Sequence, residues 1–303
     1  MENLPVDYFV KTMQFTARTH RDVYAAIDPN QTALSQKGKV IVITGASQGI
    51  GAQGFVPSFA AAGPKAIVLV ARKADKLQEV ANTIAKSYPA VETLVVPTDI
   101  GDPAAVQALF EKVKEKYGHA DVLVNNAAVF KEEKTVKDAD HQIWWEEMTL
   151  NIRGTFLATQ QFLKQLPSPE SPAKIITLTT GLAYIVYPTM SAYGISKLAV
   201  LELMAYVAAE NPNVVATALH PGIVMTDMTK DAFKRFALDT PELVGGIGVW
   251  LAGWDDPDRS FLSGRFVASN WDVEDLVGRK DEILEKDLLK MDMNAKLGAE
   301  QFE

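Results

Sequence analysis

The sequence contains no cysteine in its 303 residues, which excludes disulfide bonds, thiolate catalysis and cysteine-ligated metals. Histidine is scarce as well: the four histidines include no close pair with the spacing of metal ligands, so we predict no metal site. Basic residues are outnumbered, with 30 Lys and Arg against 38 Asp and Glu. The net charge of -8 argues against a nucleic-acid partner, which would favour a basic surface patch.

Long hydrophobic runs are also lacking. The longest apolar stretches have the length of a β-strand, far short of the ~20 residues that span a bilayer. The N-terminal stretch MENLPVDYFV contains the acidic Glu2 and no sustained apolar run, so we expect neither a signal peptide nor a membrane anchor. Without a secretory signal, the sequon at Asn30 is interpreted as a polar turn. We therefore predict a soluble, cytoplasmic protein with no membrane partner.

Seven short runs rich in β-branched residues divide the chain from Lys39 onward. They lack in/out alternation, which is typical of strands that helices bury on both faces. A helical segment from about 49 to 62 follows the first run, and Gly54 and Pro57 inside it predict a local kink. The spacing predicts right-handed βαβ units in an α/β fold, a Rossmann-type doubly wound parallel sheet of about seven strands. The runs are 39–43, 66–70, 91–96, 121–125, 174–179, 214–219 and 265–268.

Two segments lie outside this pattern, so we predict a single domain, residues 39–273, with an extension at each end. Residues 1–38 are polar and irregular, and we expect them to wrap around the domain or to contact a partner subunit. Residues 274–303 are rich in charge and contain apolar residues spaced for one face of a helix, which predicts a helical tail docked on the surface. The apolar residues of that face are Ile283, Leu284, Leu288 and Leu289.

A glycine-rich turn, TGASQGIG at 44–51, follows the first predicted strand and opens the first predicted helix. Gly45 permits the tight turn, while Gly49 and Gly51 let a phosphate-bearing ligand approach the backbone. The N–H groups at the helix start would then meet the pyrophosphate of a dinucleotide. The residues of the turn predicted to bind this cofactor are Gly45, Ser47, Gln48, Gly49, Ile50 and Gly51.

The end of the second predicted strand, Val70-Ala71-Arg72-Lys73, indicates which dinucleotide is bound. In dinucleotide folds an acidic residue there selects NAD by binding the ribose 2′-hydroxyl, whereas arginine accommodates a 2′-phosphate. Arg72 can hold that phosphate through charge-assisted hydrogen bonds, and the nearest acid, Asp75, sits where a helix N-cap is expected. We predict NADP(H) bound by Arg72 and Lys73, with NAD(H) less favoured. The alternative is that both cations are merely solvated and that both cofactors are used.

Tyr193 and Lys197 are four residues apart, a spacing that puts both on one face of a helix. The pKa of a free tyrosine, near 10, is too high for useful proton exchange at neutral pH, and a neighbouring cation lowers it. We therefore interpret Tyr193 as an acid/base group that Lys197 tunes. The spacing is common in helices, and only its occurrence behind a cofactor turn favours catalysis.

Further motifs follow in order: Asp99-Ile100 after the third strand, NNAA at 125–128, LNIRG around Asn151, and PGIVMT at 221–226. Together with TGxxxGxG and YxxxK, this ordered set resembles the short-chain dehydrogenase/reductase family over about residues 39–270. The N-terminal extension, PELVGG at 241–246 and ASNWDV at 268–273 look similar to a fungal branch of that family. Some members of the branch work in secondary metabolism.

The resemblance implies a catalytic group of Asn151, Thr180, Tyr193 and Lys197. Thr180 stands where the family has a serine, thirteen residues before Tyr193; it keeps the hydroxyl, while its extra methyl narrows the pocket. In the implied reaction NADPH gives hydride to a carbonyl carbon whose oxygen is held by Thr180 and Tyr193. Tyr193 donates the proton, and Lys197 with Asn151 connects it to solvent, while Lys197 also holds the nicotinamide ribose.

The resemblance also extends the cofactor and substrate sites. Residues 227–237 are expected to form a mobile lid, and His220 is interpreted as structural. The pocket candidates would suit a sizeable apolar or aromatic ketone, although the same residues would serve equally well as core. The additional cofactor-binding residues are Asp99, Ile100, Asn126, Ala127, Tyr193, Lys197, Pro221, Gly222, Ile223 and Thr226, and the pocket candidates are Leu182, Tyr187 and Met225, with Tyr184, Met190 and Ile223.

We thus predict a carbonyl reductase or alcohol dehydrogenase that acts on a small-molecule carbonyl or alcohol. By resemblance we expect a dimer or tetramer that pairs through helices near 140–163 and 191–209. Two alternatives stay open: a non-redox catalyst on the same scaffold, such as a cyclase or dehydratase, and an NADP-binding sensor or scaffold without turnover. The presence of both Tyr193 and Lys197 favours the redox enzyme.

Overall fold

The computed structural model describes residues 4–254, 259–295 and 298, and a parallel sheet of seven strands forms its centre. The strand order is β3-β2-β1-β4-β5-β6-β7, and every neighbouring pair is parallel. The predicted Rossmann-type doubly wound sheet is confirmed, and each predicted run matches a strand to within one residue at either end. The strands are β1 (Val40–Thr44), β2 (Ala66–Ala71), β3 (Glu92–Pro97), β4 (Val122–Asn125), β5 (Ala173–Leu178), β6 (Val214–His220) and β7 (Phe266–Ala268).

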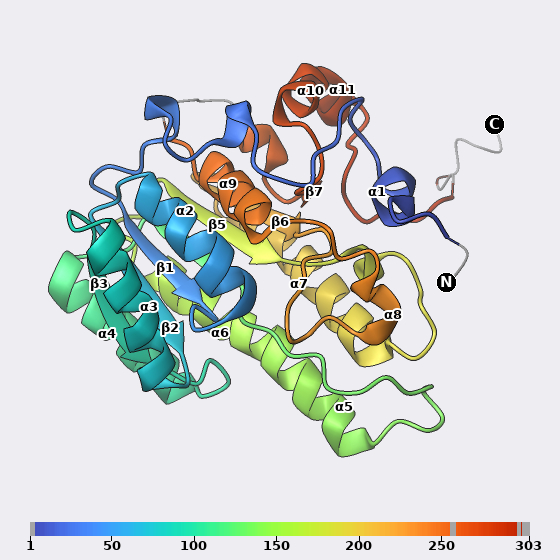
Figure 1. Ribbon diagram of the computed structural model, residues 1–303, viewed down its shortest axis with the longest axis horizontal. Helices are drawn as coiled ribbons and strands as arrows, with labels where there is room; N and C mark the ends of the chain where they lie inside the picture. The colour runs from blue at the N-terminus through green and yellow to red at the C-terminus, as the bar shows by residue number, and fades with distance from the viewer. Residues whose placement is uncertain (1–3, 255–258, 296–297, 299–303) are drawn as a thin grey trace.

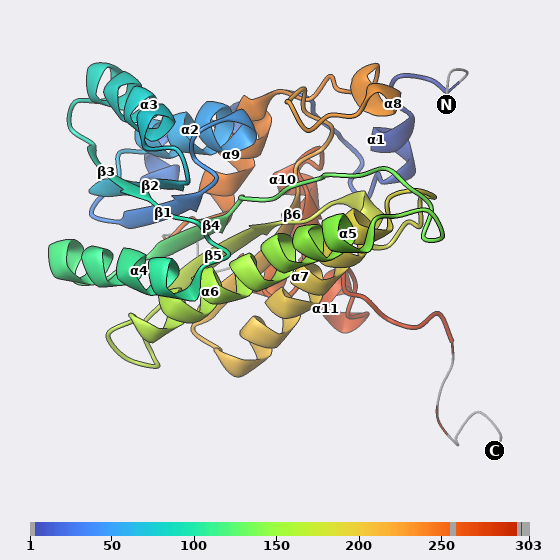
Figure 2. The same ribbon diagram turned by 90° about the horizontal axis from the view of Figure 1, so that it is seen from below.

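Helices cover both faces of the sheet and give the molecule three layers (Figure 1, Figure 2). Because both faces are covered, every residue of β1 and β4 is buried, which explains the uninterrupted apolar runs in the sequence. One face carries α2 (Val56–Ala61), α3 (Ala74–Ser87) and α9 (Pro241–Leu251). The other carries α4 (Pro103–Tyr117), α5 (His141–Met148), α6 (Thr155–Lys164) and α7 (Ser191–Glu210).

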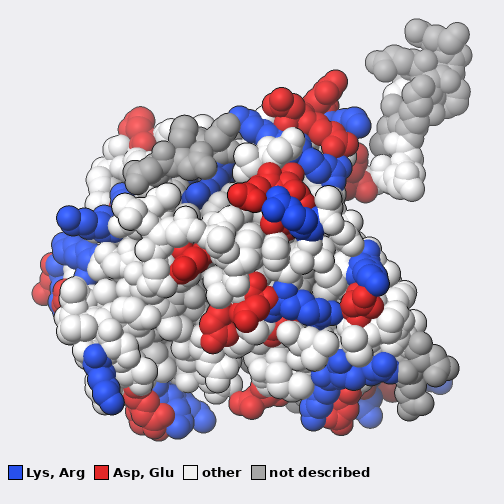
Figure 3. Space-filling view, turned by 45° about the horizontal axis from the view of Figure 1, so that its top comes forward, with Lys and Arg blue, Asp and Glu red and all other residues white. Residues whose placement is uncertain are grey.

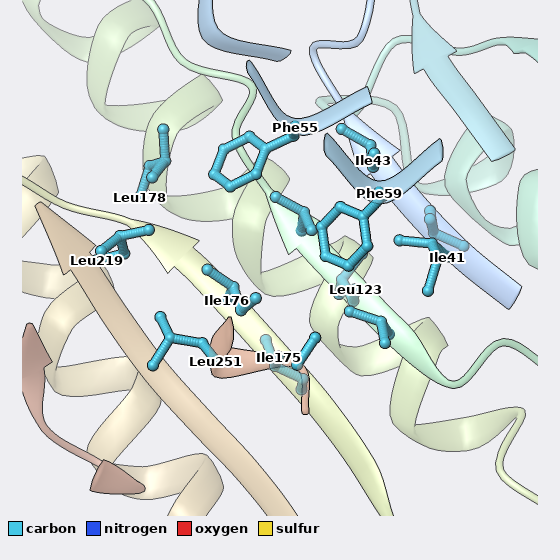
Figure 4. Close-up of a cluster of buried hydrophobic side chains, with 14 of the residues drawn as sticks. Ile41, Ile43, Phe55, Phe59, Leu123, Ile175, Ile176, Leu178, Leu219 and Leu251 are labelled. Atoms are coloured by element: carbon cyan, nitrogen blue, oxygen red, sulfur yellow. The ribbon is translucent and has the colours of Figure 1, made fainter. Parts of the chain in front are cut away.

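Aromatic residues fix the first helical segment against the sheet. Phe55 and Phe59 point onto the strands beside Ile41, Leu123 and Ile175, and all five side chains are fully buried (Figure 4). Burying side chains of this size contributes roughly 1.5–3 kcal/mol each. The start of this helical segment, where the glycine turn ends, is therefore fixed next to the carboxyl end of β1.

π-helical turns interrupt two helices. The kink expected at Gly54 and Pro57 is such a turn, η3 (Gly51–Phe55), and Pro57 then lies in the first turn of α2, where its missing N–H is tolerated. Gly54 allows α9 to pack closely, since a Cβ there would lie 2.3 Å from the carbonyl oxygen of Pro241. The second turn, η4 (Thr149–Gly154), joins α5 to α6. The long helix predicted near 140–163 is thus present in three consecutive parts.

Helix α7 is long and apolar enough, by length and composition, to cross a membrane, and it is the one such helix among the described residues. The expectation that the longest apolar stretches are strand-sized overlooked it. α7 packs against β5, β6 and α5, and buries Val200, Leu201 and Met204. A helix that covers a sheet on one side and a neighbouring helix on another needs this apolar character.

The described part of the N-terminal extension lies along the domain. Arg18 pairs with Asp272 at 2.8 Å and with Asp275 at 2.7 Å, and Arg21 pairs with Asp239 at 3.0 Å. These contacts bring α1 (Tyr8–Thr12) beside α8 (Asp231–Lys234), as Figure 2 shows. The remaining short elements are the 3₁₀ turns η1 (Ala25–Ile27), η2 (Thr32–Leu34), η5 (Gly181–Ala183) and η6 (Arg259–Leu262).

The C-terminal extension forms α10 (Val273–Gly278) and α11 (Lys280–Glu285). The helix face predicted to extend to Leu289 is cut short: α11 ends at Glu285, because the backbone turns left-handed at Asp287 (φ +48°) and Leu289 (φ +67°). Ile283 is buried as predicted, whereas Leu284 is exposed. Residues 296, 297 and 299–303 of the predicted tail lie outside the described residues. On the face seen in Figure 3, Lys and Arg lie among Asp and Glu rather than in a broad basic area.

Candidate active site

A cleft of about 570 Å³ lies at the carboxyl ends of the strands and is lined by the segments that follow β1 to β6. β1 and β4 are neighbours in the sheet but lead to helices on opposite faces, and ligands of doubly wound sheets bind at such a reversal. Most predicted site residues line this cleft: Gly45, Ser47, Gln48, Gly49, Ile50, Arg72, Lys73, Asp99, Ile100, Asn126, Ala127, Thr180, Leu182, Tyr187, Met190, Tyr193, Lys197, Pro221, Gly222, Ile223 and Thr226.

The glycine turn needs its first and last glycines for different reasons. Gly45 has φ +68°, a left-handed conformation, and a Cβ on it would lie 2.7 Å from the side-chain nitrogen of Asn126. Gly51 does not line the cleft: its Cβ would lie 2.2 Å from the carbonyl oxygen of Gly45. We expected Gly51 to open the backbone to the ligand. Instead, it lets the helix start pack against the turn.

Hydrogen bonds tie the turn after β1 to the loop after β4. The Asn126 amide donates to the carbonyl oxygens of Thr44 at 2.8 Å and Gly45 at 3.1 Å. In return, the Thr44 hydroxyl accepts from the backbone N–H groups of Asn126 and Ala127, both at 3.1 Å. Two loops from adjacent strands are therefore held in one arrangement at the centre of the cleft.

Two exposed cations, Arg72 and Lys73, line the end of the cleft near β2. Neither has an ion pair within the part of the chain that the structure describes. Lys73 is the N-cap of α3, so the expectation that Asp75 caps this helix is wrong. Asp75 is the second residue of the helix, in its first turn, and does not line the cleft. These two cations are thus available to an anionic group, and the carboxylate that lines the cleft after the neighbouring strand β3 is that of Asp99.

Tyr193 and Lys197 lie in the first turns of α7, and both line the cleft. Phe130 stacks on the Tyr193 ring with 4.8 Å between centroids, and the Lys197 Nζ lies 5.7 Å from the centre of that ring. The ammonium donates to the carbonyl oxygen of Leu178 at 2.8 Å.

Burial controls the protonation of this pair. It raises the pKa of Tyr193 above the ordinary value, and the negative charge of Glu147 acts in the same direction. Burial also lowers the pKa of Lys197 to about 8. The lowering of the Tyr193 pKa that the spacing to Lys197 predicted is absent, because removal of the phenol from water and the charge of Glu147 both raise this pKa. The phenol is protonated at neutral pH.

Thr180 and its neighbour Thr179 face different ways. The half-buried Thr180 hydroxyl accepts from the backbone N–H of Leu182 at 3.4 Å, a weak bond that leaves it available in the cleft. The fully buried Thr179 hydroxyl donates to the carbonyl oxygen of Lys197 at 2.9 Å. The two threonines thus have separate uses: Thr180 offers its hydroxyl to the cleft, while Thr179 fixes α7 against the end of β5.

Asn151 is buried beneath the cleft rather than lining it. Its side chain accepts from the Val129 N–H at 2.9 Å and donates to the Val129 carbonyl at 2.9 Å and to the Ser196 hydroxyl at 3.1 Å. Ser196 donates in turn to the carbonyl oxygen of Tyr193 at 2.8 Å. Within the described chain no hydrogen bond joins the Asn151 and Lys197 side chains, so a direct relay between them is not formed. Asn151 instead braces the loop after β4 against α7.

Two buried titratable residues beside this group were not predicted to act there. One carboxylate oxygen of Glu147 accepts from the Lys131 N–H at 2.6 Å, and the other has no partner among the described residues. Burial raises the pKa of Glu147. His220 lines the cleft with a buried Nδ1 that lacks a partner in the same part of the chain, and burial lowers its pKa to about 4. His220 is thus neutral at pH 7. No motif in the sequence pointed to Glu147.

The residues that line the substrate end of the cleft are not all the expected ones. Met225 is 50% exposed and lies outside the cleft, and Tyr184 lies outside it against Phe266, with 5.3 Å between ring centroids. The expected lid segment 227–237 contains α8 and contributes to the lining. A spacing of four between Phe9 and Met13 was the available signal for a helix face in the extension. Lining residues that sequence reasoning missed include Phe9, Met13, Phe130, Ile185, Met228, Lys230 and Phe233.

Metal-binding side chains form no cluster in the described part of the chain: no group of three or more histidine or acidic side chains there could hold a metal ion. The cleft offers hydroxyl, amine, imidazole, carboxylate and backbone groups, together with the two cations that follow β2.

Comparison with known proteins gives consistent matches. The sequence profile described as short chain dehydrogenase matches residues 39–236. "Short chain dehydrogenase pigC" of Monascus ruber is 35% identical over 300 residues, which cover 95% of this chain and 94% of that protein. "Short chain dehydrogenase andI" of Emericella variicolor is 34% identical over 287 residues, which cover 92% and 96%. A solved dehydrogenase/reductase from Sinorhizobium meliloti 1021 is 27% identical, with a TM-score of 0.70 over 78% of this chain and 95% of its own.

Proposed function

The chain belongs to the short-chain dehydrogenase/reductase family, in a fungal branch, and from this premise we propose that it transfers hydride between NADP(H) and a carbonyl or alcohol. Family membership makes the chain an oxidoreductase with a nicotinamide cofactor and a small-molecule substrate. The choice of NADP(H), a ketone as substrate and Tyr193 as the acid or base are our proposals. One observation carries them: Tyr193, Thr180 and Lys197 meet the glycine turn in a single cleft.

The described residues fit NADP(H) because the cations near β2 have no ion pair among them and Asp75, the acid that follows these cations in the chain, does not line the cleft. Arg72 and Lys73 would hold the 2′-phosphate, and the backbone N–H groups of the glycine turn would hold the pyrophosphate. The bound cofactor supplies the hydride. Asp99 and Ile100 would contact the adenine, and the nicotinamide end would lie against Asn126, Ala127, Pro221, Gly222, Ile223 and Thr226.

The proton comes from the chain. As the hydride forms a C–H bond and the carbonyl π-bond breaks, the oxygen gains a pair of electrons and needs a proton. Tyr193 keeps its proton at neutral pH because burial raises its pKa, so it can donate to that oxygen. Thr180 would hold the same oxygen from the other side, and Lys197 would bind the cofactor ribose and return a proton to Tyr193. Positioning these groups together is the principal catalytic gain.

The test is NADPH oxidation, followed at its absorbance band, with a panel of ketones. The wild-type protein is expected to consume NADPH with at least one ketone, and Tyr193→Phe is expected to bind NADPH normally but lose turnover by 10²-fold or more, the scale of a lost general acid. Tyr206→Phe is the matched control, because Tyr206 lies on the same helix but is exposed. Equal activity of the Tyr193→Phe protein would refute the assignment.

The same experiment separates the two other candidates. A sensor or scaffold binds NADPH and shows no turnover with any carbonyl or alcohol. A cyclase or dehydratase converts a substrate without a change in the cofactor absorbance, so product analysis identifies it.

The proposed assembly is a dimer or tetramer through α5, α6 and α7. It is supported by large apolar side chains on their outer surfaces: Trp145 is 61% exposed, Phe156 43% and Ile195 47%. Light scattering on the purified protein measures the mass directly. We further propose a cytoplasmic location and a role in secondary metabolism, in line with the fungal branch.

A further inference from the structure

We infer that α1 and its C-cap residue Met13 form the outer wall of the substrate site, and that Phe9 and Met13 make the enzyme selective for ketones that carry a flat aromatic group. This rests on the proposed ketone reduction and names its substrate class. The family profile begins at residue 39, so α1 lies outside the part of the chain that it matches. Specificity would thus come from a segment that is not part of the common fold.

The position of Met13 places α1 next to the catalytic hydroxyl. Gly181 directly follows Thr180, and a Cβ on Gly181 would lie 2.8 Å from the Met13 sulfur. Met13 and Phe9 both line the cleft, and α1 lies far from β2 and α3, the elements on either side of Arg72 (Figure 2). A thioether and a benzyl group therefore cover the space beside the position where the carbonyl oxygen would be held.

Phe9 joins α1 to α8 through an aromatic cluster. Its ring lies 5.6 Å from that of Phe233 and 4.9 Å from that of Phe236. Tyr187, from the loop after η5, approaches Phe233 at 5.7 Å on the cleft side. Phe9, Phe233 and Tyr187 thus form a continuous aromatic lining drawn from three separate segments. Aromatic pairs at these distances prefer edge-to-face or offset contacts, which a planar substrate group can extend.

The wall is held in place by contacts far along the chain. The Trp271 indole donates to the Met13 carbonyl oxygen at 2.8 Å, and Arg21 donates to the Val6 carbonyl at 3.0 Å. Arg21 also pairs with the buried Asp239, which accepts from the N–H of Ile223 at 2.6 Å. The extension is therefore coupled to the same loop that is expected to meet the nicotinamide, and it forms a preorganised surface.

The chemistry of this wall favours one class of substrate. It presents aromatic rings and a polarisable sulfur, which attract a flat apolar group by dispersion and by aromatic contacts. A small aliphatic ketone would reach Thr180 and Tyr193 without touching Phe9. Replacement of Phe9 should therefore weaken the binding of aryl ketones and leave the binding of small aliphatic ketones unchanged.

The experiment measures the affinity of 2-acetylnaphthalene for the protein–NADP⁺ complex by calorimetry, together with the KM of this ketone and of cyclopentanone in the NADPH assay. Phe9→Ala is expected to raise the dissociation constant of 2-acetylnaphthalene about tenfold and to change the KM of cyclopentanone by less than about twofold. Phe9→Leu keeps the apolar volume without the ring and should fall between the wild type and Phe9→Ala. Met13→Ala should follow Phe9→Ala.

Phe15→Ala is the matched control. Phe15 belongs to the same extension and packs on Trp271 and under the Arg279 guanidinium, but does not line the cleft. It should leave the affinity for 2-acetylnaphthalene unchanged. Equal losses in Phe9→Ala and Phe15→Ala, or no loss in Phe9→Ala, would overturn the inference. If binding of 2-acetylnaphthalene depends on Phe9 but no ketone is turned over, the role of α1 in the substrate site is supported and the redox function is refuted. If both ketones are turned over and Phe9→Ala changes neither, the redox function is supported and the role of α1 is refuted.

Discussion

Replacing Asn151 with alanine should uncouple the loop after β4 from α7, and the cost follows from the structure. The side chain is buried and makes three hydrogen bonds, two with the backbone of Val129 and one with the Ser196 hydroxyl. A typical buried hydrogen bond contributes about 1 kcal/mol to stability, so the three together amount to about 3 kcal/mol. Alanine leaves the N–H and the carbonyl of Val129 without these side-chain partners, whereas the Ser196 hydroxyl keeps its bond to the Tyr193 carbonyl oxygen.

The free energy of unfolding in urea, followed by tryptophan fluorescence, measures this loss. Asn82→Ala is the control: Asn82 lies exposed on α3 and accepts a single hydrogen bond from Gln78, so a change within about 0.5 kcal/mol is expected. Turnover should also fall in Asn151→Ala, because Ser196 connects Asn151 to the backbone of Tyr193. A loss of stability below about 0.5 kcal/mol in Asn151→Ala would refute the bracing role.

Two further predictions concern the cofactor and pH. Arg72→Ala should lower the affinity for NADPH by about 10- to 100-fold in a binding titration, the scale of a lost charge-assisted bond, and should change the affinity for NADH little. Lys76→Ala is the control: Lys76 lies outside the cleft, so neither affinity should change. An equal loss of affinity for both cofactors would refute the role of Arg72 in binding the 2′-phosphate. Burial lowers the pKa of His220 from the ordinary 6.5 to about 4. Below pH 6.5 His220 therefore binds a proton in the unfolded chain but not in the folded one, so the free energy of unfolding falls as the pH drops. At pH 5 the contribution lost is about 2 kcal/mol, and His220→Asn should flatten the urea-derived stability curve between pH 7 and pH 5; parallel curves for the two proteins would contradict this.

The sheet could be predicted from the sequence because burial on both faces demands continuous apolar, β-branched strands. β1 and β4 are buried along their whole lengths, and their ends were predicted to within one residue. The cofactor end was readable for a related reason: the glycine turn and Arg72 directly follow strand ends, and the carboxyl ends of parallel strands share one edge of the sheet. Local sequence therefore fixed where these groups lie.

Features that depend on distant contacts were not predictable in this way. Met13 reaches the cleft through a bond to Trp271, 258 residues away in the sequence. The direction of a loop side chain such as Met225 is likewise decided by packing rather than by its neighbours in the sequence. The spacing of Tyr193 and Lys197 placed both on one face of a helix, but it contained no information on their burial, which raises the pKa of the phenol instead of lowering it.

The most direct test of the central proposal is the fate of the hydride. The wild-type protein is given NADPH that carries deuterium at both C4 positions of the nicotinamide, so that transfer from either face delivers the label, together with a ketone that it consumes. The alcohol product is analysed by mass spectrometry. Hydride transfer supported by Tyr193 predicts one deuterium in the alcohol for each NADPH consumed, and loss of that product in Tyr193→Phe but not in Tyr206→Phe. An alcohol without deuterium, or the same rate of labelling in Tyr193→Phe, would contradict it.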